Sequence, residues 1–134
     1  MKNRFSQADW ESYRERLLPI ISQTAKRNGH DHTQRIDDAL SNKRAFLFLC
    51  PDGFVVLSLR GKQEKRRLLV LFAFGWGEHL IARYQPQIDD MARRAKAQKV
   101  ELYTAVLGLS PLLEKQGYIR SQTNGHVGHW TKTL

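Results

Sequence analysis

The sequence predicts an α/β (α+β) fold built on one mixed sheet. An antiparallel meander is followed by a parallel strand–helix–strand unit and a C-terminal hairpin. Apolar runs of strand length recur along the chain, with turn residues between them. Two of these runs flank a long amphipathic segment, which is the pattern of a parallel βαβ unit. Near the end, an Asn-Gly pair divides two further strand-like runs and indicates a hairpin.

Length and composition favour one folded domain over residues 1–134. Hydrophobic residues make up 41% of the chain, which excludes a disordered composition. No apolar run approaches the roughly 18 residues of a membrane span, and the N-terminus has no apolar signal core. Cys50 is the single cysteine, so it cannot form an internal disulfide. We therefore expect a cytoplasmic protein that does not enter a membrane.

The N-terminal part predicts two helices. Residues 6–9 have the composition of a helix start, in which serine caps free N–H groups. Trp10, Tyr13 and Leu17 then recur at helical spacing, and Pro19 is expected to kink or divide the helix. A second, short helix is expected over residues 34–40. The intervening His30-Asp31-His32 lacks a third ligand at fixed spacing, so the sequence predicts no metal site.

The centre of the chain predicts the meander and the parallel unit. Strands are expected over 45–50, 54–59 and 68–74, joined by turns at 51–53 and 60–67. A Gly75-Trp76-Gly77 break follows, then an amphipathic helix whose apolar face includes Tyr84, Ile88 and Ala92, and then a strand over 100–105. Pro86 leaves two alternatives open: the helix begins at Glu78 and kinks, or it begins at Pro86 itself.

The C-terminal part predicts a short helix and a hairpin. Ser110 is a suitable helix cap, Pro111 a suitable first helical residue and Gly117 a suitable terminator. Strands are expected from Tyr118 and over 127–133. His126 and His129 would lie on opposite sides of a strand, so no metal site is expected there either.

This element order resembles the GNAT superfamily of N-acetyltransferases over nearly the whole chain. Residues 109–119 are similar to the family's short helix before its sixth strand, where Leu-Leu-Glu-Lys-x-Gly-aromatic is a common ending. Gly75-Trp76-Gly77 stands where the family has its glycine-rich cofactor loop. The resemblance implies an acetyl-CoA-dependent N-acyltransferase that acts on an amine of a small molecule or a protein.

The resemblance also implies a cofactor site. In the GNAT fold, acetyl-CoA enters where the fourth and fifth strands splay apart, and its pyrophosphate sits on free N–H groups at a helix start. The expected cofactor-binding residues here are Phe72, Phe74, Gly75, Trp76, Gly77, Glu78 and His79. Several positions depart from the family pattern, among them the bulky Trp76 between the glycines and Val106 or Leu107 where an asparagine often precedes the short helix. Phe72 replaces a leading basic or amide residue, Glu78 adds a negative charge, and Leu113 stands near the place of a general-acid tyrosine.

The candidate catalytic residues are Glu101 and Tyr103. Being two apart in a strand, they share one face and could present a base and a proton donor together. Glu78 and His79 are further candidates near the splay. The alternative is structural: Glu101 as a solvated charge at a sheet edge, and Tyr103 packed in the core.

The net charge of +9 leaves two other functions open. One is a non-catalytic, degenerate GNAT-like protein of phages or prophages, located in the virion or interacting with a host partner. The other is a basic module that binds nucleic acid or an acidic partner. The residues expected to make that contact are Arg60, Lys62, Lys65, Arg66 and Arg67. A basic surface with no dedicated partner is the simpler alternative.

Overall fold

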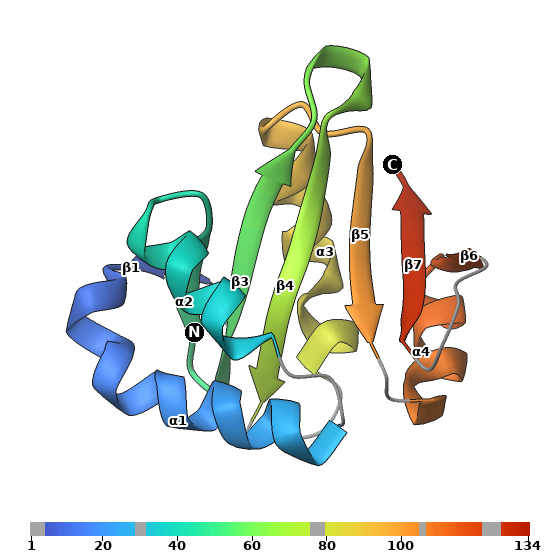
Figure 1. The fold of residues 1–134 in the computed structure, drawn as a ribbon. Helices are drawn as coiled ribbons and strands as arrows, with labels where there is room; N and C mark the ends of the chain where they lie inside the picture. Colours follow the sequence, from blue (N-terminus) through green and yellow to red (C-terminus); the bar gives the residue numbers. More distant parts are fainter. Residues whose placement is uncertain (1–4, 29–31, 76–79, 105–106, 122–126) are drawn as a thin grey trace.

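A seven-stranded mixed sheet forms the centre of the molecule, with helices on both of its faces (Figure 1). The computed structural model describes residues 5–28, 32–75, 80–104, 107–121 and 127–134. The strands are β1 Ser6–Ala8, β2 Phe46–Cys50, β3 Gly53–Arg60, β4 Arg67–Gly75, β5 Lys99–Thr104, β6 Ile119–Ser121 and β7 Gly128–Thr133. The helices are α1 Trp10–Asn28, α2 Thr33–Ser41, α3 Leu80–Arg94 and α4 Ser110–Lys115, with 3₁₀ turns η1 Gln63–Lys65 and η2 Leu107–Leu109.

The sheet confirms the predicted fold class. Its strand order is β1-β2-β3-β4-β5-β7-β6. The strands β2, β3 and β4 form the antiparallel meander, and β4 pairs with β5 in parallel through the α3 crossover. The C-terminal strands form the antiparallel hairpin, with β7 inserted between β5 and β6. The expected turn at Asn124-Gly125 lies outside the described residues.

The first described element is a strand that no pattern in the sequence predicted. Residues 6–8 pair with β2 as an edge strand, so Ser6 is not a helix cap. Asp9 is the residue directly before α1. Its carboxylate accepts a hydrogen bond from Ser12 Oγ at 3.0 Å, and its carbonyl accepts one from the Ser12 N–H at 3.2 Å. Pro19 lies inside α1 and does not divide it; Figure 1 shows the helix bending along its length.

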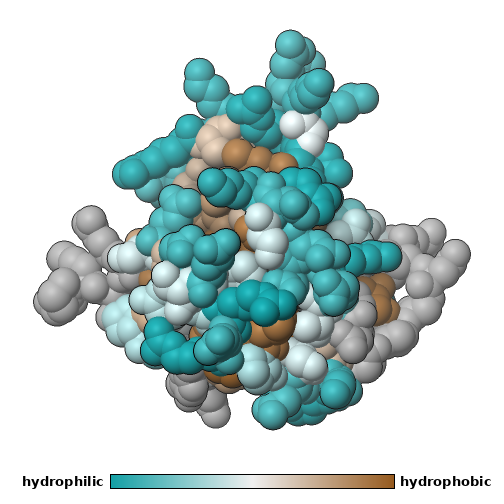
Figure 2. Space-filling model, turned by 60° about the vertical axis from the view of Figure 1, so that its left-hand side comes forward, coloured by the Kyte–Doolittle hydropathy of each residue, from teal (hydrophilic) through white to brown (hydrophobic). Residues whose placement is uncertain are grey.

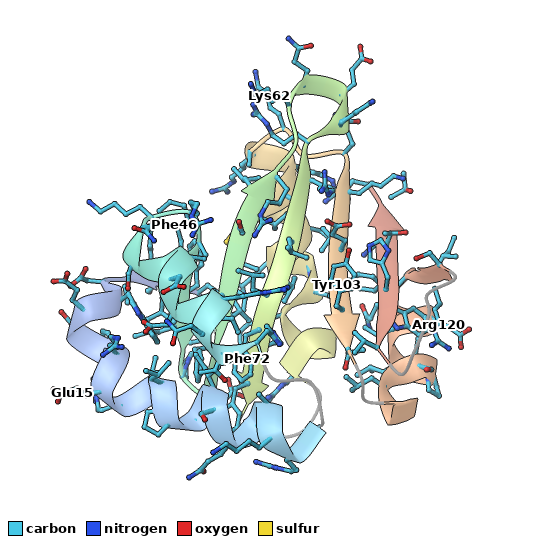
Figure 3. All side chains as sticks on the ribbon, viewed as in Figure 1. Glu15, Phe46, Lys62, Phe72, Tyr103 and Arg120 are labelled. Atoms are coloured by element: carbon cyan, nitrogen blue, oxygen red, sulfur yellow. The ribbon has the colours of Figure 1, made fainter. Side chains whose placement is uncertain are left out.

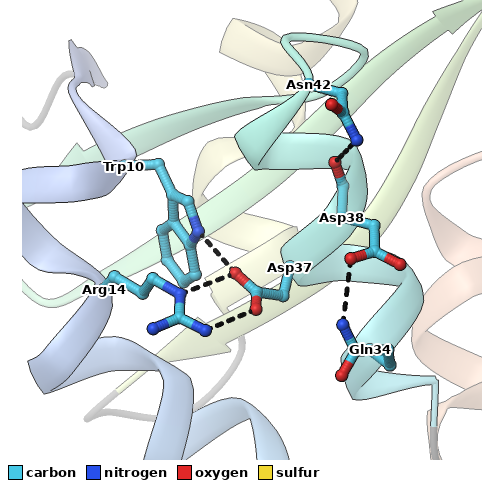
Figure 4. Close-up of polar contacts among 6 residues, drawn as sticks. All are labelled: Trp10, Arg14, Gln34, Asp37, Asp38 and Asn42. Carbon is cyan, nitrogen blue, oxygen red and sulfur yellow. Dashed lines mark hydrogen bonds and ion pairs between the residues drawn. The ribbon is translucent and has the colours of Figure 1, made fainter.

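One face of the sheet is covered by α1 and α2, which are joined by a buried carboxylate (Figure 4). Asp37 Oδ1 accepts hydrogen bonds from Trp10 Nε1 and Arg14 Nε, both at 2.9 Å, and its Oδ2 lies 2.7 Å from Arg14 Nη2. The Arg14 guanidinium holds the pKa of Asp37 below its usual value. Beneath this contact lies an apolar cluster that includes Ile21, Ile36 and Phe54. A charged group therefore fixes the geometry of this helix pair.

The opposite face is covered by α3 and α4. Among the described residues α3 begins at Leu80 and continues through Pro86, so Pro86 is not its first residue. Tyr84, Ile88 and Ala92 pack against the sheet from this helix, as the periodicity predicted. Asp89, on the same helix, is buried and accepts hydrogen bonds from Gln85 and from Lys132 of β7. These bonds tie the helix to the C-terminal strand.

The short helix α4 contributes Leu113 to the same core, where the side chain is fully buried. Leu109, the residue before α4, ends a 3₁₀ turn. Ser110 is therefore the first residue of α4 and not the cap of this helix. Gly117 has φ +96°, a conformation that glycine adopts without strain, and it ends the helix as predicted.

The outer surface beside α1 and α2 is largely hydrophilic, with smaller apolar areas between the charged side chains (Figure 2). The β3–β4 hairpin projects from the sheet as a group of hydrophilic side chains. In the described part of the chain, no helix is long and apolar enough to cross a membrane.

Candidate active site

The two parallel strands at the centre of the sheet pair over only part of their length. Their ladder runs from Arg67–Lys99 to Val70–Leu102. Beyond that point β4 continues to Gly75 and β5 to Thr104, but no further pairs join them. Strand β4 stays paired with β3 as far as Gly75. A strand edge that leaves its neighbour in mid-sheet presents backbone N–H and C=O groups to another extended chain.

A β-bulge marks the place where the strands part. Val56 of β3 pairs with Phe72, whereas Leu57 pairs with Val70, so Leu71 has no partner on β3. The bulge changes the alternation of side chains along β4. Arg67 and Leu69 face α1 and α2 before it, and Phe72 and Phe74 do so after it. Because β4 has one extra residue at the bulge, the side chains that face α1 and α2 change from odd-numbered to even-numbered positions in its second half.

A cavity of about 530 Å³ lies on the α1–α2 face beside the bulge. Its walls come from α2, the segments directly before and after it, the end of β3, and the strands β4 and β5. The lining residues are His32, Arg35, Asp38, Ala39, Arg44, Arg60, Arg67, Leu69, Val70, Leu71, Glu101 and Tyr103. The volume is within the range of small-molecule sites, and the walls combine apolar strand residues with charged groups.

Glu101 is the buried charge of this cavity. Its side chain is 8% exposed, and each carboxylate oxygen has its own partner. Arg67 Nε donates to Oε1 at 2.6 Å, and His129 Nε2 lies 2.9 Å from Oε2. Because a carboxylate accepts only, the His129 ring must carry its proton on Nε2 in this contact. Arginine and histidine thus fix the direction in which the carboxylate points.

His129 connects Glu101 to two further side chains. Its Nδ1 lies 2.8 Å from Ser121 Oγ on β6. Its ring stacks on the ring of Tyr103, with centroids 4.5 Å apart and planes 12° apart. Tyr103 is 47% exposed, and within the described residues its hydroxyl has no hydrogen-bond partner. Three strands, β5, β6 and β7, therefore bring a carboxylate, an imidazole, a hydroxyl and a phenol together.

The structure contradicts the alternative in which Glu101 is a solvated charge at a sheet edge and Tyr103 packs in the core. Glu101 is buried and paired and is not a solvated edge charge. Tyr103 lines the cavity and does not pack in the core. Both side chains lie on one face of β5, on the cavity wall (Figure 3 labels Tyr103).

The predicted cofactor residues are only partly described. Phe72 is buried in the apolar cluster under α1 and α2, and Phe74 packs at the edge of that cluster. Gly75 ends β4. The remaining predicted residues, Trp76, Gly77, Glu78 and His79, lie outside the described residues, so their contacts with a cofactor stay a prediction.

Sequence reasoning missed several residues that surround Glu101. His129 and Ser121 come from the C-terminal hairpin, and Arg67 comes from the start of β4. His32, from the segment before α2, donates from Nε2 to the carbonyl of the bulge residue Leu71 at 3.2 Å. The sequence carried no signal for the contact between Glu101 and His129. In the β5–β7 register His129 pairs with Tyr103, and Glu101 lies two residues before Tyr103 on the same strand face, so the contact follows from a register that only the fold establishes.

The basic β3–β4 loop does not act as one patch. Arg60 and Arg67 turn toward the cavity, and Arg66 donates to the carbonyl of Ala95 at 3.1 Å. Lys62 lies at the tip of the hairpin, far from Tyr103 and Phe72 (Figure 3). Within the part of the chain that the structure describes, no group of three or more His, Cys, Asp or Glu side chains could hold a metal ion.

No family model matches the sequence, and no curated protein matches it either. Solved structures do match along nearly the full chain. FeeM, an N-acyl amino acid synthase from uncultured soil microbes, has a TM-score of 0.77 at 10% identity, covering 98% of this chain and 91% of that one. The PaiA N-acetyltransferase of Thermoplasma acidophilum, in complex with coenzyme A, has a TM-score of 0.69 at 13% identity and full coverage of both chains.

A GNAT-family acetyltransferase from Listeria monocytogenes also matches, with a TM-score of 0.68 at 10% identity, covering 100% of this chain and 99% of that one. The resemblance to the GNAT fold is therefore confirmed at the level of structure. A connection with phages finds no support in these similarities.

Proposed function

We propose that this protein is an acetyl-CoA-dependent N-acyltransferase that transfers the acyl group to an amine. The observation that carries the proposal is the end of the β4–β5 ladder at Val70–Leu102, directly beside a cavity that contains Glu101 and Tyr103. An acyltransferase needs a donor site and an acceptor site that meet at one point. The parted strands β4 and β5 offer the donor site, and the cavity offers the acceptor site.

The strands fit an acyl-pantetheine arm. From Leu71 onward the side of β4 that faces β5 is outside the ladder, so its backbone can pair with the amides of an extended arm. When bound, acetyl-CoA supplies a thioester carbonyl that an amine can attack. The bulge residue Leu71 packs against the apolar cluster under α1 and α2, and its carbonyl accepts a hydrogen bond from His32 Nε2.

The reaction forms a C–N bond and breaks the C–S bond, so one proton leaves the amine and the thiolate receives one. We assign the first role to Glu101, whose carboxylate accepts the proton directly or through one water. Arg67 and His129 orient that carboxylate, which makes them positioning residues. We assign the second role to Tyr103, because its half-exposed hydroxyl stands on the cavity wall and has no partner among the described residues.

Titration with acetyl-CoA tests the donor half of the proposal. A ligand that binds only the folded protein raises the free energy of unfolding, by about 2.7 kcal/mol at a hundredfold excess over Kd. We expect a rise in the melting temperature with acetyl-CoA and thiol release when an amine is added. Free acetate and adenosine are the matched ligand controls. No thermal shift at millimolar acetyl-CoA would overturn the proposal in favour of a fold used only for binding.

Nucleic-acid binding receives less support from the structure. Two of its five expected residues, Arg60 and Arg67, line the cavity, and Arg66 donates to the carbonyl of Ala95, directly after α3. The remaining lysines at the hairpin, Lys62 and Lys65, are too few for the strong salt dependence of a phosphate-binding surface.

A further inference from the structure

We propose that the acceptor is a small amine that also carries an anionic group, a carboxylate or a phosphate, and that Arg35, Arg44 and Arg60 bind this group. This inference rests on the proposed function, because it names the substrate class of the same cavity. Two observations support it: the cavity wall has more arginines than carboxylates, and three of these arginines form no ion pair within the described residues.

Four arginines from four different segments line the cavity: Arg35 in α2, Arg44 after α2, Arg60 at the end of β3 and Arg67 at the start of β4. Among the described residues of this wall, two are carboxylates, Asp38 and Glu101. The wall therefore has an excess of positive charge. Such a cavity attracts an anion and disfavours a purely cationic amine.

The four arginines differ in their partners. Arg67 forms an ion pair with Glu101. Arg35, Arg44 and Arg60 have no ion pair with any carboxylate in the described part of the chain, and Asp38 is engaged by Gln34 Nε2 at 2.9 Å. A guanidinium offers several N–H donors in one plane and binds carboxylate or phosphate through two of them. Three such groups around one space form a receptor for an anion.

Arg60 is held in place by a buried side chain. Its Nε donates to Ser58 Oγ at 3.0 Å, and Ser58 is 1% exposed. The Ser58 hydroxyl in turn donates to the carbonyl of Arg44 at 2.6 Å. One buried hydroxyl thereby connects two of the three arginine segments and leaves the terminal nitrogens of Arg60 available. Arg60, like Arg35 and Arg44, is exposed, and the buried Ser58 hydroxyl fixes the base of its guanidinium on the cavity wall.

The positions of the groups define the acceptor. Its amine must reach Glu101 and Tyr103 beside the parted strands, and its anion must reach the arginines on the same wall. A cavity of about 530 Å³ holds a compound of amino-acid size with room to spare. Amino acids and amino phosphates share this chemistry, and the experiment separates them.

The experiment uses matched pairs of acceptors with the protein and acetyl-CoA: leucine against leucinamide, β-alanine against its amide, and phosphoethanolamine against ethanolamine. We expect the anionic member of a pair to have at least a tenfold higher kcat/KM. Amine reactivity cannot cause this preference, since an amide has the less basic amine and hence more of its free-base form near neutral pH. The pair that shows the larger ratio identifies carboxylate or phosphate as the anion.

The variants Arg35→Gln, Arg44→Gln and Arg60→Gln should each raise the KM of the anionic acceptor about tenfold, with kcat little changed, and leave the KM of the neutral partner unchanged. Arg93→Gln, an exposed position on α3 on the other face of the sheet, is the matched control. Equal use of both members of every pair, or equal KM values in the variants, would overturn the proposal. A loss of acetyl-CoA affinity in the variants would also overturn it, because the arginines would then serve the cofactor.

Calorimetric binding of the same compounds separates this proposal from the proposed function. If acetyl-CoA binds and neutral amines are acetylated without preference, the acyltransferase stands and the anion site is wrong. If no turnover occurs with any acceptor, binding still decides: an acid that binds while its amide does not, and that loses affinity in Arg60→Gln, supports the anion site by itself. No binding of any anionic compound overturns it.

Discussion

Two buried carboxylates on the same side of the sheet have nearly the same partners. Asp37 is 9% exposed and Glu101 is 8% exposed. Each is paired with an arginine that is itself 47% and 41% exposed, respectively, at 2.7 and 2.6 Å. Each also faces an aromatic N–H at 2.9 Å, from Trp10 Nε1 and from His129 Nε2.

The difference between them lies in their surroundings. Asp37 is enclosed between α1 and α2, and its hydrogen-bond partners include two side chains of α1, Trp10 and Arg14. Glu101 lies on the wall of a cavity, next to a half-exposed tyrosine and beside the place where two strands part. A buried ion pair is thus weak evidence for either stability or catalysis. Access to space for a substrate separates the two roles.

The largest expected effect is on activity at Glu101. Glu101→Gln keeps the shape and removes the base, so we expect kcat/KM for acyl transfer to fall about 100-fold. Acetyl-CoA affinity, measured by calorimetry, should stay within about twofold, because the donor binds along β4 and not on this carboxylate. If activity stays near wild type while stability falls, Glu101 is a structural carboxylate like Asp37 and the comparison fails.

The next effect is on stability at Asp37. Asp37→Ala leaves the indole N–H of Trp10 without its partner in a buried position, which costs about 2 kcal/mol in the free energy of unfolding. The half-exposed Arg14 adds little because water screens its charge. Urea denaturation measures the change. Asp90→Ala is the control: it removes the exposed Asp90–Arg94 pair and should cost less than about 0.5 kcal/mol.

A smaller effect is expected at Tyr103. Tyr103→Phe keeps the stacking on His129 and removes only the hydroxyl, so stability should not change. If the phenol donates to the departing thiolate, kcat should fall about tenfold, the equivalent of one hydrogen bond. An unchanged kcat would mean that Tyr103 only lines the cavity and that solvent protonates the departing thiolate.

The smallest effect is the pH dependence of the Asp37 contact. Because Arg14 holds the pKa of folded Asp37 below its usual value of 3.8, the unfolded chain binds the proton more readily. This contribution to stability is complete above about pH 5 and is lost as the pH falls through the folded pKa. Urea denaturation of wild type and Asp37→Asn should show a stability gap at pH 6 that narrows toward pH 3. A gap that is constant with pH would mean that the charge of Asp37 does not matter.

Much of the fold could be predicted because its elements have local signatures. The apolar runs predicted β2 to β5 within one residue at each end, and the spacing of Tyr84, Ile88 and Ala92 predicted the buried face of α3. The three-residue strand β1 has no such signature. Its pairing depends on an available edge of β2, which no pattern within residues 6–8 records.

The site was harder to predict than the fold. Glu101 and Tyr103 could be proposed because two residues on one strand face follow from strand geometry alone. Their partners could not, since Arg67, Ser121 and His129 are brought to Glu101 by pairing across β4, β5, β7 and β6. The same is true of the arginines in the cavity, which arrive from helix, loop and strand.

By itself, the sequence determined the type and order of the main elements, the parallel crossover and one face of β5, because periodicity and turn residues act over a few neighbours. The tertiary structure decided three things that depend on distant partners. It placed the bulge at Leu71 and ended the β4–β5 ladder at Val70. It carried α3 through Pro86, since packing of the flanking turns offsets the missing hydrogen bond. It also gave Asp37 and Glu101 different roles, because burial and access to a cavity exist only once the chain has folded.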